Sequence, residues 1–248
     1  FPDTNPRSRW QKATAAPITP TGTITSKDAY GWDFRGLPYA GQLQWYPDLD
    51  FGNYTPSRQA AWSVSGAGNY LVLAGEFPTV NGVAQQGLVR FANRGVVGPS
   101  QKPIYNAAMN PTVTSTDSGT ARIRWTSTWD RDDRTLTYDV YRDGGGSIAT
   151  LTQDSIFWKL PAMGFLDTGL APGSTHTYKI RVKDGDGNVQ WSLASAPVTV
   201  SGAAPSAYTQ AVRGDGASHL WKLGDSGPAI ADAAGFGDGT SSNASFGA

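Results

Sequence analysis

The chain has 248 residues, enough for one large β domain or two to three small ones, and its 20 Lys and Arg balance its 20 Asp and Glu. No basic tract could track a phosphate backbone, which excludes nucleic acid as a partner, and no apolar run approaches the ~20 residues that span a bilayer. Cysteine is absent, which rules out disulfides, thiolate metal sites and cysteine nucleophiles.

Turn-forming residues are abundant, with 30 Gly and 16 Pro. Few windows keep the spacing of an amphipathic helix before a Gly or Pro intervenes. The chain is therefore predicted to be all-β and multi-domain. Proline-containing joints divide it into three segments, residues 1–98, 108–201 and 205–248.

In the first segment, three strands are predicted around two turns. The strands are Gln59–Val64, Asn69–Ala74 and Gly87–Ala92. Ser65–Gly68 is expected to join the first two, and Asn81–Gly82 indicates a tight turn, because both residues tolerate positive φ.

These strands carry a motif that resembles one blade of a bacterial β-propeller family. The matching residues are Trp62, Tyr70, Gly75, Glu76, Phe77, Val80, Asn81, Gly82, Leu88, Arg90 and Phe91. A propeller needs 4–8 blades, and only one clear copy is present. The resemblance therefore implies that residues 1–98 are the terminal blade region of a larger propeller.

The second segment has the size of one seven-stranded sandwich. A Leu-x-Pro-Gly turn at Leu170–Gly173 leads into a strand with Tyr178, which predicts a tyrosine corner whose hydroxyl bonds to upstream backbone. With the phrase Tyr138–Gly144, the segment resembles fibronectin type III-like modules of bacterial surface proteins and polysaccharide-active enzymes. The predicted strands are 112–115, 121–126, 136–142, 148–152, 157–160, 175–183 and 197–200.

The third segment, from Tyr208 to Gly235, resembles the opening of a laminin G/concanavalin-like jelly roll. Such a domain is longer than residues 205–248, so we expect only its truncated N-terminal part. Arg213-Gly-Asp215 is the integrin-binding tripeptide, but three residues match often by chance, and a turn is expected here.

No catalytic constellation is evident. The only histidines are His176 and His219, and packing roles are expected for both. Nucleophile-elbow, zinc-protease, phosphate-loop and dinucleotide motifs are absent. Paired glycosidase carboxylates leave little trace in a sequence. The chain is predicted not to be an enzyme.

Two candidate binding sites emerge. The first is an aromatic group that includes Trp32, Trp45, Tyr46 and Tyr54. Its exposed members could stack on sugar rings, although aromatic side chains are also commonly buried in hydrophobic cores. Asp184, Asp186 and Asn188 space oxygen ligands as a Ca²⁺ loop does. The alternative for that loop is a tight turn with local side-chain hydrogen bonds, and both interpretations remain open.

The charged loop Asp130–Arg134 is explained by Arg–carboxylate pairs, with a ligand surface as the alternative.

The order of these modules predicts a non-catalytic adhesion or glycan-binding fragment of a modular bacterial protein. The expected partner is a polysaccharide or cell-surface glycan. The expected location is extracellular or cell-wall associated, and no membrane insertion is expected. Two alternatives stay open. The chain could supply accessory modules of a secreted carbohydrate-active enzyme, or be a phage or injection-system tail component.

Overall fold

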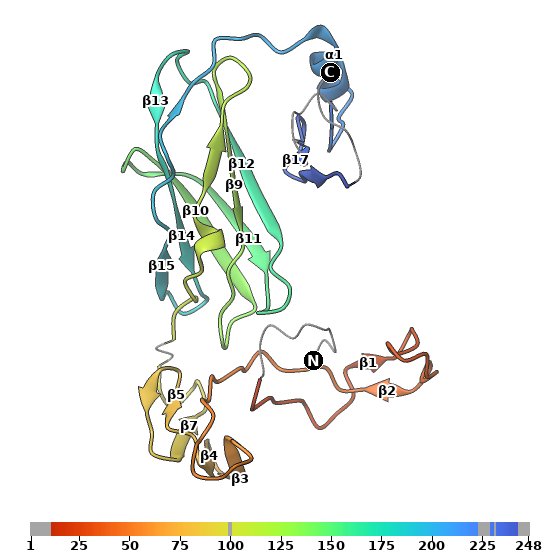
Figure 1. Ribbon diagram of the computed structural model, residues 1–248, viewed down its shortest axis with the longest axis vertical. Helices are drawn as coiled ribbons and strands as arrows, with labels where there is room; N and C mark the ends of the chain where they lie inside the picture. The colour runs from red at the N-terminus through yellow and green to blue at the C-terminus, as the bar shows by residue number, and fades with distance from the viewer. Residues whose placement is uncertain (1–10, 99–100, 223–228, 231, 243–248) are drawn as a thin grey trace. The chain divides into compact units, whose positions relative to one another are not determined.

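The computed structural model describes residues 11–98, 101–222, 229–230 and 232–242 (Figure 1). The chain divides into two compact units, Phe1–Gln101 with Arg131–Arg134, and Lys102–Asp130 with Thr135–Ala248. Strands dominate both, and the helices described are the 3₁₀ turn η1 (Ala107–Met109) and α1 (Ala207–Gly214). The predicted all-β class is confirmed. None of the helices in the described ranges is long and apolar enough to cross a membrane.

The first unit is built on an antiparallel sheet with the order β3-β4-β7. The strands are β3 (Ala61–Ala67), β4 (Tyr70–Gly75) and β7 (Leu88–Ala92), with β1 (Gly22–Thr23) paired to β2 (Pro38–Tyr39) and β5 (Thr79–Val80) to β6 (Val83–Ala84). The three predicted strands are confirmed, but β3 runs on to Ala67, so the turn is tighter than expected. Asn81 and Gly82 join β5 to β6 with φ of 51° and 78°, as predicted.

The motif residues of the first unit hold its backbone together. Phe77 is fully buried in a core with Leu49, Leu73 and Val80. Glu76 accepts hydrogen bonds from the Thr55 amide (2.7 Å), the Thr55 hydroxyl (2.8 Å) and the Gln59 amide (2.5 Å). The carboxylate therefore fastens the preceding loop to the end of β4, and its place in the motif has a structural explanation.

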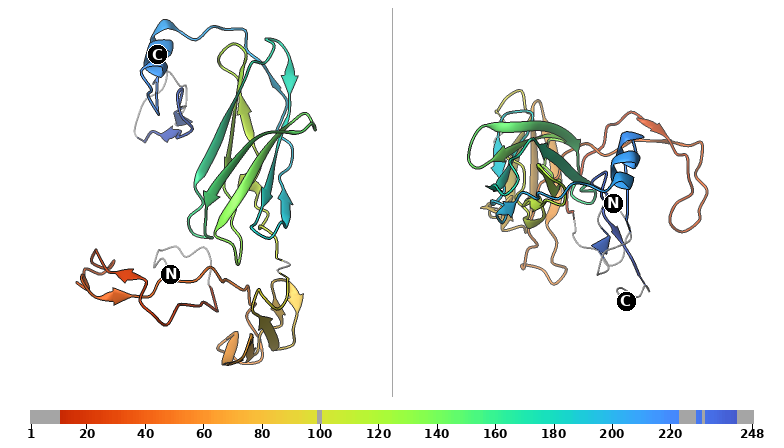
Figure 2. Two further views of the ribbon diagram at one scale, coloured as in Figure 1. Left: turned by 180° about the vertical axis from the view of Figure 1, so that it is seen from behind. Right: turned by 90° about the horizontal axis from the view of Figure 1, so that it is seen from above.

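The second unit contains a β-sandwich, drawn green to teal in Figure 1 and seen from behind and above in Figure 2. One sheet has the order β11-β10-β14-β15 and the other β12-β9-β8, with β13 paired to β16. This is the arrangement of a fibronectin type III-like sandwich. The strands are β8 (Thr112–Thr114), β9 (Thr120–Thr126), β10 (Thr135–Arg142), β11 (Ser147–Asp154), β12 (Ala162–Thr168), β13 (Thr175–His176), β14 (Tyr178–Lys183), β15 (Val189–Trp191) and β16 (Val198–Thr199).

Alternation along the strands builds the sandwich core. On β14, Tyr178, Ile180 and Val182 are buried, and the three residues between and after them face outward. β10 and β9 contribute inward residues in the same way, and the rings of Trp125 and Tyr138 lie 6.4 Å apart across the two sheets.

One predicted strand is wrong. Phe157–Leu160 forms a turn closed by the bridge between Ile156 and Lys159, and the strand that pairs with β9 is β12. The rings of Phe157 and Trp158 pack on each other in this turn, with their centroids 4.5 Å apart. β15 was not predicted as a strand.

The tyrosine corner has a different acceptor from the one predicted. The buried Tyr178 hydroxyl donates to Asp167 Oδ2 at 2.8 Å, a side chain and not backbone. Asp167 also accepts from Arg142 Nη1 at 2.8 Å. The hydroxyl that bonds to backbone belongs to Tyr138, which donates to Thr128 O (3.1 Å) and accepts from Thr128 N (3.0 Å). Tyr138 thus ties the loop after β9 to its sheet, whereas Tyr178 joins β14 to β12 of the other sheet.

Alkaline pH is expected to destabilise the sandwich through Tyr138. Burial raises the pKa of this phenol to about 12, against 10.0 for an ordinary tyrosine. Folding favours the neutral phenol, so Tyr138 stabilises the fold fully below pH ~10 and loses this effect as the pH rises to ~12. The free energy of unfolding should fall by about 3 kcal/mol over this range. Urea unfolding monitored by near-UV circular dichroism from pH 8 to 12 measures it.

The control for this titration is Tyr138→Phe. It should lower stability by about 1 kcal/mol at pH 8, because the two Thr128 bonds are lost, and flatten the decline above pH ~10. Burial also raises the pKa of Tyr178, so some decline should remain. Equal slopes in the two proteins would contradict the assignment to Tyr138.

The C-terminal part of the second unit is organised around Asp232. α1 is capped by Ser206, whose hydroxyl accepts from the Thr209 amide, and β17 (Ala229–Ile230) pairs with β18 (Gly239–Thr240). Asp232 is 1% exposed and accepts from the amides of Leu220 and Gly235. Burial alone would raise its pKa, but these bonds and one from His219 outweigh burial and lower it. The jelly-roll interpretation stays a prediction, and residues 223–228, 231 and 243–248 of this segment lie outside the described residues.

Candidate functional site

The first unit contains an open pocket of about 830 Å³, within the size range of small-molecule sites. Its apolar wall includes Trp45, which is half-buried and meets Phe91 edge-on at 5.1 Å between ring centroids. Amide and guanidinium side chains line it too, among them Gln44, Asn69, Gln85, Arg90, Asn93 and Gln101. An aromatic wall with amides around it suits the apolar and hydroxyl faces of a sugar.

Tyr70 is the most exposed aromatic residue of this pocket, with 41% of its surface accessible. The guanidinium of Arg90 lies 4.9 Å from its ring centroid. Arg90 pairs with Val72 in the register of β4 and β7, so it is the diagonal neighbour of Tyr70. The contact holds the ring in place and leaves part of it open to a ligand.

The four predicted aromatic residues fall into two groups. Trp45 and Tyr46 line the pocket, whereas Trp32 and Tyr54 lie outside it, 68% and 85% exposed. Tyr46 is 2% exposed, so its ring has no open face for stacking. Burial raises the pKa of its hydroxyl, an effect that Arg134 reduces. Sugar binding by these residues stays a prediction.

Sequence reasoning did not single out Tyr70 and Arg90 as candidate binding residues. Both were noted only as members of the propeller-like motif. Their proximity depends on the pairing of Val72 with Arg90, which follows from the register of the sheet. A Tyr and an Arg on two predicted antiparallel strands were the available signal, but only the register makes them neighbours.

The Asp184–Asn188 loop forms a turn between β14 and β15. Asp184 Oδ1 accepts from the amides of Asp186 (3.0 Å) and Asn188 (2.8 Å), and Oδ2 accepts from the Asn188 side chain (2.8 Å). The Asp184 oxygens are thus occupied by local donors, as the turn alternative expected. Ca²⁺ binding by Asp184, Asp186 and Asn188 stays a prediction.

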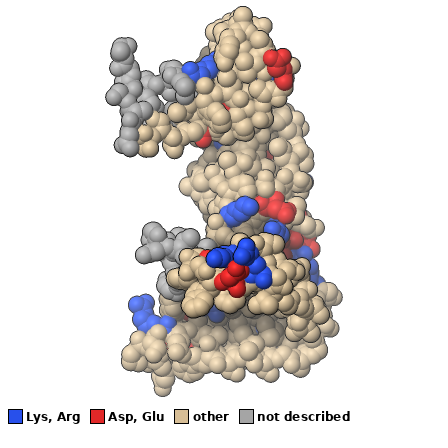
Figure 3. Space-filling model, turned by 90° about the vertical axis from the view of Figure 1, so that its right-hand side faces the viewer, with Lys and Arg blue, Asp and Glu red and all other residues tan. Residues whose placement is uncertain are grey.

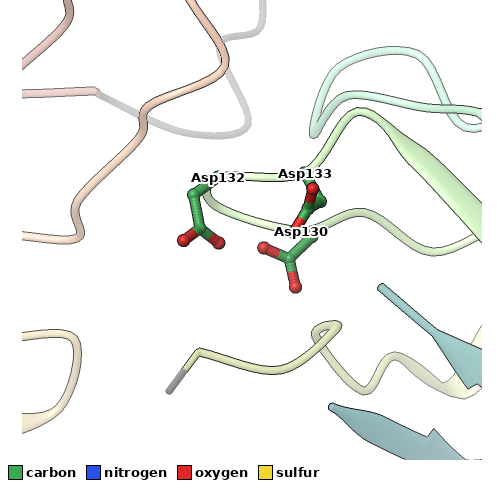
Figure 4. A group of neighbouring side chains, drawn as sticks. All are labelled: Asp130, Asp132 and Asp133. Atoms are coloured by element: carbon green, nitrogen blue, oxygen red, sulfur yellow. The ribbon is translucent and has the colours of Figure 1, made fainter. Parts of the chain in front are cut away.

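The loop between β9 and β10 carries Asp130, Asp132 and Asp133 (Figure 4). Within the first unit, Arg94 Nη2 lies 2.7 Å from Asp133 and 3.5 Å from Asp132. Asp130 belongs to the second unit and is fully buried. Figure 3 likewise shows basic and acidic side chains next to each other. The ion-pair interpretation of the loop therefore accounts for Asp132 and Asp133.

His176 links a carboxylate to a serine in an order that superficially suggests a hydrolase. Its Nδ1 lies 2.6 Å from Asp143 Oδ2 and its Nε2 2.8 Å from Ser174 Oγ. Ser174 Oγ, however, donates to Ala171 O at 2.6 Å. The one hydroxyl proton of Ser174 thus has a backbone acceptor that competes with Nε2, whereas a nucleophile must give its proton to the base. The group is best explained as a clamp beside the tyrosine corner.

Two further residues singled out in the sequence are used by the fold. His219 Nδ1 donates to Asp232 Oδ2 at 2.5 Å, and its ring stacks on Trp221. Arg213 of the integrin-type tripeptide pairs with Asp117 at 2.6 Å and donates to Ala233 O at 2.9 Å. An arginine held in this way is not presented to a receptor.

Comparisons with known proteins find similarity to solved structures, among them a fibronectin type III domain. No family model matches the chain, and no curated protein matches it. The sixth fibronectin type III domain of a human fibronectin type III domain containing protein 3 is 17% identical, with a TM-score of 0.28, over 46% of this chain and 99% of that one. The human OSCAR ligand-binding domain is 10% identical, with a TM-score of 0.27, over 53% and 88%. A structure described as a myokine is 13% identical, with a TM-score of 0.23, over 42% and 97%. Identities and TM-scores this low carry no argument. The assignment of the second unit as a fibronectin type III-like sandwich therefore rests on the strand order of its two sheets.

Proposed function

We propose that this chain is a non-catalytic, glycan-binding part of a modular bacterial protein that is secreted or held at the cell surface. The observation that supports this best is the open pocket of the first unit, with Tyr70 at its exposed side. The sandwich acts as a spacer and binding module. The partner is a polysaccharide or cell-surface glycan.

The same proposal includes the finer assignments of the outer segments. Residues 1–98 are the terminal blade region of a propeller, and residues 205–248 are the start of a laminin G-like domain. The motif that ends in Leu88–Phe91 supports the first assignment. The second is supported by the sequence from Tyr208 to Gly235.

Binding to a panel of neutral soluble and insoluble polysaccharides tests the proposal. The whole chain should be retained by at least one of them, and Tyr70→Ser should weaken that binding at least about tenfold, because a stacking ring is lost. Tyr54→Ser is the matched control, since Tyr54 is 85% exposed outside the pocket and should bind like the parent. Thermal melting verifies that both variants stay folded.

Three outcomes bear on the proposal. Absence of retention on every polysaccharide would contradict glycan binding. Equal losses in Tyr70→Ser and Tyr54→Ser would exclude the pocket as the site. Retention that EDTA abolishes would instead assign binding to a Ca²⁺ site, for which Asp184, Asp186 and Asn188 are the candidates.

A further inference from the structure

The outer face of the sandwich sheet β10-β14-β15 carries a row of cations between aromatic rings. Three cations alternate along β14, Lys179, Arg181 and Lys183, while the residues between them face the core. Tyr141 of β10 and Trp191 of β15 lie on either side, their ring centroids 4.9 Å apart. We call these five residues the outer face.

The rings and cations are interleaved. The Arg181 guanidinium lies 5.2 Å from the ring centroid of Tyr141 and 5.7 Å from that of Trp191. The Lys179 ammonium lies 5.8 Å from the same Trp191 ring. Trp191 is nevertheless 40% exposed, so part of its surface remains open to a ligand. Cation–π contacts of this kind fix the ring without covering it.

The charge on the outer face is not balanced. Asp139 is 3% exposed and accepts from Arg181 (3.0 and 2.8 Å), while Lys183 lies 3.2 Å away and the Thr150 hydroxyl donates at 2.7 Å. One carboxylate thus serves two cations. Among the described residues Lys179 has no carboxylate partner. Among Lys179, Arg181, Lys183 and Asp139, three positive charges stand against one negative charge, an excess of two.

We propose that the outer face binds an acidic polysaccharide, a linear chain of sugar rings that carry carboxylates. Alternate residues of a strand lie ~6.6 Å apart on one side, so Lys179 and its neighbours present positive charge in a line that a linear polyanion can follow. The open part of Trp191 takes the apolar face of a sugar ring.

Neighbouring hydroxyls favour a sugar over other polyanions. Thr137 and Thr150 flank Asp139 on the same side of the sheet, and Thr152 pairs with Thr137. Hydroxyls exchange hydrogen bonds with sugar hydroxyls, whereas an excess of two charges is small for binding a nucleic acid backbone. This site goes beyond the proposed function, because it lies in the second unit and does not use the pocket.

Binding of the whole chain to polygalacturonate, compared with the methyl-esterified polymer, tests the inference. Binding should require the free carboxylates and weaken as salt is raised. Trp191→Ala and Lys179→Glu should each weaken it at least about tenfold, since one removes the ring and the other reverses a charge. Lys159→Glu, the same charge reversal at an exposed turn outside the face, should change it by less than about twofold.

Several results would overturn the proposal. They are lack of binding to polygalacturonate at low salt, equal binding to the esterified polymer, and loss with Lys159→Glu as large as with Lys179→Glu. Tighter binding to poly-glutamate or to a single-stranded oligonucleotide would assign the face to another polyanion. Lys179→Glu keeps the test decisive if Trp191→Ala melts early. Tyr70-dependent retention on neutral glycans would survive each of these results, so the two proposals fail separately.

Discussion

Replacing Gly75 by alanine is expected to unfold the first unit or to lower its stability by at least about 3 kcal/mol. A Cβ at this position would lie 2.0 Å from Ala60 O and 2.8 Å from Ala61 Cα. Both are backbone atoms at the start of the neighbouring strand β3, and Ala60 O already accepts from the Glu76 amide at 2.9 Å. Because backbone cannot yield as a side chain can, the strands must separate.

Gly66→Ala is the matched control for this prediction. Gly66 lies in β3 of the same sheet, and a Cβ there would contact Tyr70 O at 3.6 Å, an ordinary distance. Alanine should be neutral or stabilise the strand by up to about 1 kcal/mol, because glycine loses more entropy on folding. Urea unfolding followed by tryptophan fluorescence, with hydrogen exchange to locate the change, compares the variants. Equal stability of the two would show that Ala60 does not confine this position.

The parts of the fold that depend on local chemistry could be predicted from the sequence. The alternation of Tyr178, Ile180 and Val182 predicts a half-buried strand, and Asn81-Gly82 predicts a tight turn because both residues accept positive φ. The strand β12 could not be predicted in this way. It contains Gly164 and is held by its pairing with β9, a contact made over long sequence separation.

The candidate site shows the same division. The aromatic residues indicated a binding site, but Trp45 and Tyr46 are adjacent in sequence and could not be told apart there. Only the folded unit shows that Tyr46 is buried whereas Trp45 is half-buried in the pocket wall. The acceptor of Tyr178 is a further example. The Leu170–Gly173 turn predicts where the tyrosine lies, whereas the choice of Asp167 over backbone depends on the packing of β12 near β14. Local patterns predict elements, and tertiary contacts select partners.

Replacing Asp167 by alanine is expected to destabilise the second unit by about 3 kcal/mol, the larger of two effects at the tyrosine corner. Asp167 is 6% exposed and joins Tyr178 to Arg142, so its loss leaves a buried hydroxyl and a partly buried cation without their acceptor. Tyr178→Phe removes only the hydroxyl and should cost about 1 kcal/mol, since Arg142 keeps its partner. Urea unfolding of the whole chain measures both.

A double-mutant cycle separates the hydrogen bond from the ion pair. Once Asp167 is alanine, Tyr178→Phe should cost nothing or restore part of the stability, because it removes a hydroxyl that has no acceptor, and the coupling should be about 1–2 kcal/mol. Asp167→Asn keeps an acceptor oxygen but no charge. It should therefore lower the stability by more than Tyr178→Phe and by less than Asp167→Ala. Additive losses would contradict the shared role of Asp167. They would mean that each partner finds another acceptor or water, and that the corner is held mainly by the packing of the Tyr178 ring.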